Sequence, residues 1–166
     1  MMKWYLVSME ISVVFDEGLE ASLEVGWLRG IVERVLVAQN ADPGVELSLV
    51  IASQERVQQL NSSYRGRDEP TDVLAFSAVE EIDTDLPPFV APPDGMLHLG
   101  EVIVSYPQAV AQAEEHQHSA KKEIAILIIH GVLHLLGYDH DKLELEQEMF
   151  ARSEEILGYI EKELKL

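Results

Sequence analysis

Residues 11–51 read ISVVFDEGLEASLEVGWLRGIVERVLVAQNADPGVELSLVI, and their hydrophobic period changes twice. The β-branched and aromatic run at 11–15 stops at acidic residues, which indicates a strand. Apolar residues then recur at helical spacing over 28–36, until turn residues end the helix. Alternation over 45–51 indicates a second strand. The stretch therefore predicts a β-α-β unit, whose crossover connection is normally right-handed.

The rest of the chain shows similar signals for helices and strands. A serine before a helical pattern predicts an N-cap, because its hydroxyl can accept a hydrogen bond from a backbone N–H of the first turn. The predicted features are helix starts at Ser53, Ser105 and Ser119, strands at 73–77 and 97–105, and a closing helix at 143–160 with Met149, Ile156 and Ile160 facing inward. The acidic, proline-rich stretch at 78–95 fits neither a helix nor a central strand, so it is predicted to be an exposed loop.

Composition restricts the kind of protein. A chain of 166 residues with 47% hydrophobic and 25% charged residues is typical of one soluble globular domain. No apolar stretch is long enough to cross a bilayer, and no secretory cleavage site follows the apolar start, so we expect a cytoplasmic protein without a membrane partner. The net charge of -18 disfavours general attraction to nucleic-acid phosphates, so any RNA-binding role requires a local basic site.

The chemistry-bearing segment is HGVLHLLGYDH at 130–140. His130 and His134 are one helical turn apart, so both imidazoles can reach one ion. Gly137 can end the helix in a left-handed turn and let the chain bring His140 over the same face. Three histidines leave one coordination position open, as in catalytic zinc sites, where the ion lowers the pKa of bound water to about 7. We therefore predict one divalent transition metal at this site, with zinc favoured and nickel as an alternative.

Other polar residues near this segment leave alternatives open. The chain has no cysteine, so only histidine and carboxylate side chains remain as good ligands for a transition metal. Asp139 and Asp141 could complete the coordination or could orient an imidazole from outside it. The remaining histidines, His98, His116 and His118, are scattered near predicted element ends, and we expect them to be solvated and without a role.

The spacing of the three histidines and Gly137 resembles that of the metzincin zinc proteases. Those proteases carry a glutamate as general base directly after the first histidine. Here Gly131 stands at that position, and glycine has no side chain that could move a proton. Peptide hydrolysis by the protease mechanism is therefore disfavoured.

The same segment, read with its glycine, is similar to the signature of the YbeY family, bacterial metal-dependent endoribonucleases that mature ribosomal RNA. Two further blocks resemble that family: NSSYRGRDEPTDVLAF at 61–76 and LGEVIVS at 99–105. The order of elements resembles the family over roughly residues 9–160. The chain departs from the usual family pattern at Ala75, where serine is common, and at Ser77, where proline is common.

The resemblance implies a fold and a set of site residues. The fold is a single α/β (α+β) domain over 1–166, with a four-stranded mixed sheet of three parallel strands and one antiparallel edge strand, about five helices and a metzincin-like metal-binding helix. The implied metal ligands are His130, His134 and His140, and the implied catalytic residues are Arg65 and His130. Arg65 would face the metal cleft, where its guanidinium could neutralise charge on a phosphodiester. The alternative is that it pairs with Asp68 or Asp72 in a surface turn.

The resemblance also implies a function and partners. The expected function is single-strand-specific endoribonuclease activity at the 3′ end of small-subunit ribosomal RNA, with a part in ribosome quality control. The expected partners are ribosomal RNA, the small ribosomal subunit and the GTPase Era. One alternative is a ribosome-assembly factor whose metal mainly holds the fold. Another is a hydrolase of a different substrate, whose base would come from Glu101 or Asp72.

Overall fold

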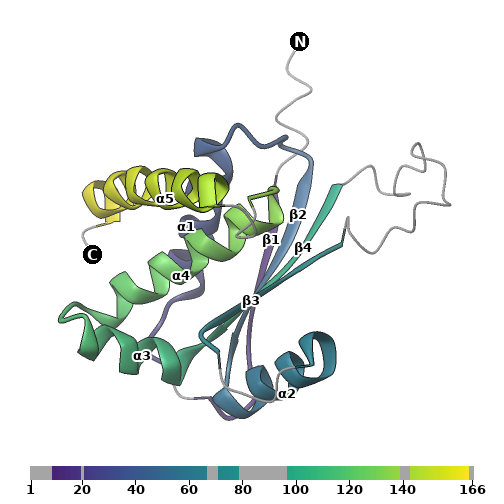
Figure 1. The fold of residues 1–166 in the computed structure, drawn as a ribbon, viewed down its shortest axis with the longest axis vertical. Helices are drawn as coiled ribbons and strands as arrows, with labels where there is room; N and C mark the ends of the chain where they lie inside the picture. The colour runs from purple at the N-terminus through teal and green to yellow at the C-terminus, as the bar shows by residue number, and fades with distance from the viewer. Residues whose placement is uncertain (1–8, 20, 67–70, 79–96, 139–142, 165–166) are drawn as a thin grey trace, which may run out of the picture.

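The computed structural model describes residues 9–19, 21–66, 71–78, 97–138 and 143–164, and within them helices and strands alternate as expected (Figure 1). The elements are β1 (Glu10–Phe15), α1 (Val25–Ala38), β2 (Val45–Ala52), α2 (Gln54–Arg65), β3 (Val73–Ser77), β4 (Leu97–Ser105), α3 (Tyr106–Glu115), α4 (Ala120–Leu135) and α5 (Leu143–Leu164). Apart from Ala78, the predicted loop at 78–95 lies outside the described residues. Among the described helices, none combines the length and the apolar character that crossing a bilayer requires.

The four strands form one sheet in the order β1-β2-β4-β3. β1 pairs with β2 and β2 pairs with β4 in parallel, whereas β3 pairs with β4 antiparallel at the edge. The mixed sheet with three parallel strands, one antiparallel edge strand and five helices is therefore confirmed for the described part of the chain.

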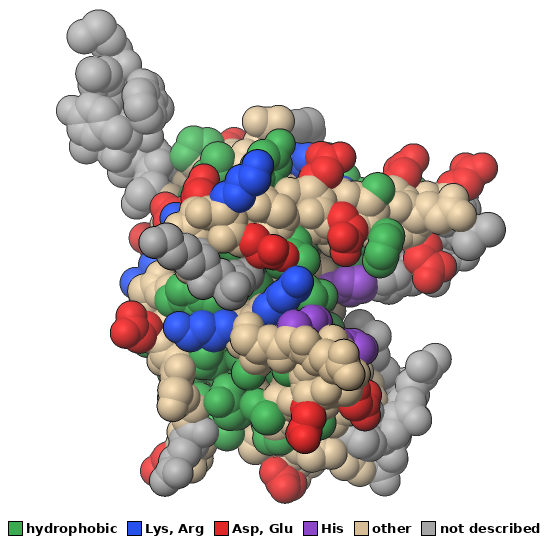
Figure 2. Space-filling view, turned by 90° about the vertical axis from the view of Figure 1, so that its left-hand side faces the viewer, with side chains coloured by type: hydrophobic (Ala, Val, Ile, Leu, Met, Phe, Trp, Pro, Cys, Tyr) green, Lys and Arg blue, Asp and Glu red, His purple; other side chains and the backbone are tan. Residues whose placement is uncertain are grey.

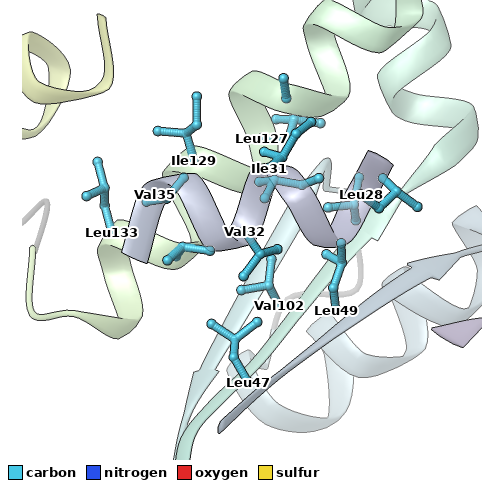
Figure 3. Packing of buried hydrophobic residues seen from close by; sticks show 14 of the residues in the cluster. Leu28, Ile31, Val32, Val35, Leu47, Leu49, Val102, Leu127, Ile129 and Leu133 are labelled. Carbon is cyan, nitrogen blue, oxygen red and sulfur yellow. The ribbon is translucent and has the colours of Figure 1, made fainter. Parts of the chain in front are cut away.

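Helices cover both faces of this sheet, but unequally (Figure 1). The larger core lies between one face of the sheet and helices α1, α4 and α5, and Figure 3 shows side chains from α1, α4 and the central strands meeting there. The opposite face holds a smaller cluster, in which Val57 of α2 packs with Leu74 of β3 and Ile103 of β4. β2 and β4 are therefore buried on both faces along part of their length, as parallel strands usually are.

Local signals in the sequence account for several helix boundaries. The hydroxyls of Ser53, Ser105 and Ser119 each accept a hydrogen bond from a backbone N–H in the first turn of the following helix, so the three predicted N-caps are confirmed. Helix α5 begins where expected and runs to residue 164 rather than 160, with Met149, Ile156 and Ile160 buried as predicted.

Helix α4 is the central helix of the fold. It contacts α1, α3 and α5 as well as β3 and β4. Most of its residues are buried, including Ile124, Ile128 and Val132, which agrees with the expectation of a helix that is apolar all round. An element buried this completely holds the side chains at its C-terminal end in fixed positions, and these include the histidine pair.

Candidate functional site

His130 and His134 lie in the last two turns of α4. Their ring centroids are 6.1 Å apart and the ring planes are inclined by 54°. Both side chains are half-buried, between the buried residues of the core and the surface. Two imidazoles at this separation can direct one nitrogen each toward a common ion, so the geometry is compatible with the predicted ligand pair, which stays a prediction.

Gly131 explains how the histidine pair approaches the sheet. A Cβ atom on this residue would lie 2.5 Å from Cγ1 of Val102 in β4, which is closer than real Cβ atoms come to a neighbour. Val102 is fully buried, so it has little room to move. Position 131 therefore serves the packing of α4 on β4, because even a methyl group there would force Val102 to shift.

The end of α4 is fixed by backbone hydrogen bonds around Gly137, which has a φ of 109°. The N–H of Gly137 donates to the carbonyl of His134 at 3.1 Å, and the N–H of Tyr138 donates to the carbonyl of Leu133 at 3.1 Å. This pair of bonds is the Schellman arrangement, in which a left-handed residue closes the helix. The predicted turn at Gly137 is therefore confirmed, and the chain changes direction one turn after His134.

The other predicted site residues are not placed by the structure. His140, Asp139 and Asp141 lie outside the described residues. Arg65 is the last residue of α2, but its side chain is outside the described atoms, so its position relative to the histidines stays a prediction.

The two acidic residues considered as an alternative base differ in their surroundings. Glu101 shares a face of β4 with Ile103, which packs in the cluster under α2, whereas Val102 faces α4. Glu101 therefore points to the face of the sheet opposite the histidine pair. The carboxylate of Asp72 accepts a hydrogen bond from Gln112 of α3 at 3.2 Å, which directs it toward α3.

A second group of ligand-type side chains lies at the other end of α4. One ligand atom from each of His116, His118 and Glu123 falls within 4.8 Å of the other two, which makes this a possible metal-binding group. The expectation that these histidines are solvated is wrong for His118, whose side chain is 20% exposed and contacts Glu123. His98 also contacts an acidic side chain, since its Nδ1 lies 3.0 Å from Oε1 of Glu46.

Sequence reasoning missed Glu123. It appears in the sequence as an ordinary glutamate in the first turns of a helix, where acidic residues are common because of the helix dipole. The signal that could have found it is the spacing of two histidines two residues apart, followed across a predicted N-cap by an acidic residue on an otherwise apolar helix.

Comparison with known proteins identifies the family to which this chain belongs. The chain matches the sequence profile described as "YbeY: Endoribonuclease YbeY" over residues 17–161, which is most of its length. The chain belongs to the YbeY family. The resemblance of the three sequence blocks to that family is therefore confirmed.

Named relatives in the YbeY family match nearly the whole chain. A protein named Endoribonuclease YbeY from Dehalococcoides mccartyi is 46% identical over 155 residues, which cover 92% of this chain and 90% of that protein. One of the same name from Bacillus cytotoxicus is 40% identical over 152 residues, covering 87% of this chain and 92% of that protein. The solution structure of TM1509 from Thermotoga maritima has a TM-score of 0.61 at 25% identity and covers 93% of this chain and 91% of that one.

Membership of the YbeY family settles the class of activity. The chain is an enzyme with nuclease activity, in the hydrolase class, as the resemblance implied. The fold is similar to that of TM1509 over most of both chains.

Proposed function

We propose that the chain is a single-strand-specific endoribonuclease that matures the 3′ end of small-subunit ribosomal RNA and takes part in ribosome quality control. Its relatives are named as endoribonucleases, and the family match covers residues 17–161 of what we take to be a single domain over residues 1–166. The observation that carries the proposal is the histidine pair His130 and His134, held by a buried helix with its rings 6.1 Å apart. We place the protein in the cytoplasm, with ribosomal RNA, the small ribosomal subunit and the GTPase Era as partners.

The donor set fits a divalent transition metal. His130, His134 and His140 would hold the ion, and imidazoles suit zinc or nickel, with zinc favoured. When bound, such an ion supplies positive charge that polarises a phosphodiester. His130 counts as catalytic in this proposal because its ring would contact the reacting centre. The half-buried positions of His130 and His134 favour metal binding, since each imidazole is held by the core on one side and can reach an ion on its solvent side.

Substrate binding is assigned to Arg65 in this proposal. Its guanidinium has five donors in a rigid fork, which matches the oxygens of a phosphodiester and could neutralise the charge that grows there during cleavage. A chain with a net charge of -18 needs such a local cation, because its overall field repels RNA. Glycine at position 131 offers no general base, and Glu101 faces the opposite side of the sheet, so proton transfer must use another group.

The test is cleavage of a single-stranded ribosomal RNA fragment by purified protein loaded with zinc. We expect His134→Ala to lower the cleavage rate by at least about 100-fold, because a ligand of the proposed ion and the orientation that it gives are lost. Arg65→Lys should lower it by roughly 10-fold or more, since a lysine cannot form the two-pronged contact.

The matched control is His98→Ala. His98 pairs with Glu46 on the sheet, on elements other than α4, so its loss should leave the rate within about twofold. Cleavage by His134→Ala at the wild-type rate would show that a contaminating nuclease, rather than this chain, cuts the RNA.

A second candidate is a ribosome-assembly factor that binds the small subunit and uses its metal to hold the fold. The burial of α4 favours it, because ligands on a central helix would couple ion binding to the stability of the whole domain. Complementation separates the two candidates. An inactive Arg65→Lys protein, which keeps the proposed metal ligands, would support the binding role if it still restored ribosome maturation, whereas failure to restore it would support the nuclease.

A further inference from the structure

The connection between α3 and α4 brings two histidines to the same side of the chain. Gln117 has a φ of 59°, in the left-handed region that non-glycine residues seldom occupy. The N–H of Gln117 donates to the carbonyl of Glu114 at 3.2 Å, and that of His118 donates to the carbonyl of Ala113 at 3.1 Å. These bonds close α3 in a Schellman arrangement. A left-handed residue between them lets His116 and His118 both reach Glu123 of α4.

Glu123 is a buried carboxylate, with its side chain only 3% exposed. Its Oε2 lies 2.7 Å from Nε2 of His118, and its Oε1 lies 3.3 Å from Nδ1 of His116. A buried carboxylate needs a compensating positive charge, which a neutral imidazole does not provide. The group therefore lacks a cation unless one of the rings is protonated or an ion is bound between the three side chains.

Nearby cations are directed elsewhere. The Nζ atom of Lys122 lies 3.5 Å from Oε1 of Glu161 in α5, and that of Lys121 lies over the ring of Trp27 at 5.4 Å from its centroid. Both lysines are therefore engaged with other elements of the fold. Figure 2 shows histidine side chains at the surface on one side of the molecule. The side chain of His116 is 56% exposed and that of His118 is 20% exposed, so an ion from solvent can reach the group.

The three ligand atoms lie close enough together, within 4.8 Å of one another, to surround one ion. Tetrahedral ligands at about 2.0–2.1 Å from zinc are separated from one another by about 3.3 Å. The separation of 3.3 Å between His116 and Glu123 matches that edge and is long for a charge-assisted hydrogen bond. Measured to the other carboxylate oxygen, Oε2, the separation from His118 is 2.7 Å, which is a hydrogen-bond distance. It would have to open by several tenths of an ångström when an ion binds, which a change in side-chain torsion allows.

We propose that His116, His118 and Glu123 form a second site for a divalent transition metal, which joins the end of α3 to the start of α4. Two histidines and one glutamate are a ligand set that zinc accepts, with one position left for water. The ligands come from the end of α3, the connection that follows it and the first turns of α4, so a bound ion holds that connection in place.

This site is separate from the histidine pair at the other end of α4. Glu123 and His130 are seven residues apart on one helix, which is about 10 Å along its axis. Two ions that act together on a phosphodiester are about 3.5–4 Å apart. The second ion therefore does not take part in the same chemistry as the first.

The test measures zinc binding in a background that lacks the first site, His130→Ala with His134→Ala. Equilibrium dialysis followed by elemental analysis should find one zinc per chain in this background. Adding His118→Ala should weaken that binding by more than about 100-fold, beyond what residues that only orient a ligand contribute. Zinc at 100 times its dissociation constant should also raise the melting temperature of the background variant by roughly 5–10 °C.

Two further variants keep the result interpretable. His98→Ala in the same background removes another histidine that faces a glutamate, and it should leave the zinc content at one per chain. His116→Ala removes a side chain that is 56% exposed, so it should weaken zinc binding while circular dichroism shows an unchanged fold. No zinc in the background variant, or an equal loss with His98→Ala and His118→Ala, would overturn the proposal. Neither result depends on whether the chain cuts RNA.

Discussion

Gly131 sets the distance between α4 and β4, and replacing it tests that contact. We expect Gly131→Ala to lower the free energy of unfolding by about 1–2 kcal/mol. Forcing a methyl group against Val102 costs about 1–3 kcal/mol, and the better helix propensity of alanine returns at most about 1 kcal/mol. Urea denaturation measures the change. The matched control is Gly158→Ala in α5, where nothing lies within 4 Å, and a loss of stability there of the same size would contradict the packing argument.

The sequence predicted the histidine pair on α4 but missed the packing of Gly131 and the contacts of Glu123, and each difference has a physical reason. His130 and His134 were predictable because a helix brings residues four apart onto one face whatever the rest of the chain does. The contact between Gly131 and Val102 joins residues far apart in sequence, so no local pattern reveals it. Glu123 was missed because its partners depend on a left-handed turn at Gln117, and glutamine carries no signal for that conformation.

Helix α4 depends on its N-cap, because its first turn lies at the surface where α3 ends. The hydroxyl of Ser119 accepts a hydrogen bond from the N–H of Lys122 at 3.1 Å. We expect Ser119→Ala to lower the free energy of unfolding by about 1 kcal/mol, measured by urea denaturation. Ser63→Ala, at an exposed position inside α2, should leave the stability unchanged or raise it slightly. An unchanged stability for Ser119→Ala would mean that solvent satisfies the first turn equally well.

At the scale of elements, what is local in sequence was predictable and what is distant was not. Cap residues, the glycine at the end of α4 and the burial of α5 all follow from neighbours within a few positions. The order β1-β2-β4-β3 does not, since hydrophobic alternation marks a strand without naming the strand that it pairs with. The expectation of three parallel strands and one antiparallel edge strand came from the resemblance to the family, and the order itself comes from the structure.

The whole molecule carries 30 acidic and 12 basic residues, and its net charge of -18 should make it less stable in low salt. Like charges repel more strongly in the compact state, and raising salt from 10 to 100 mM shortens the screening length from about 30 to about 10 Å. We expect the melting temperature to rise by roughly 2–4 °C over that range. The variant Glu148→Gln with Glu154→Gln removes two exposed charges of α5 and should respond less. A melting temperature that falls with salt would show that ion pairs outweigh repulsion.

Helix α4 contacts helices and strands on several sides of the fold, so it cannot open without breaking the main core. Its histidine pair is therefore already rigid before any ligand arrives. Binding at this pair loses little conformational entropy, since no segment of α4 has to become ordered. Folding of the domain therefore already places the two imidazoles for binding, and the entropy cost of fixing them does not fall on the ligand.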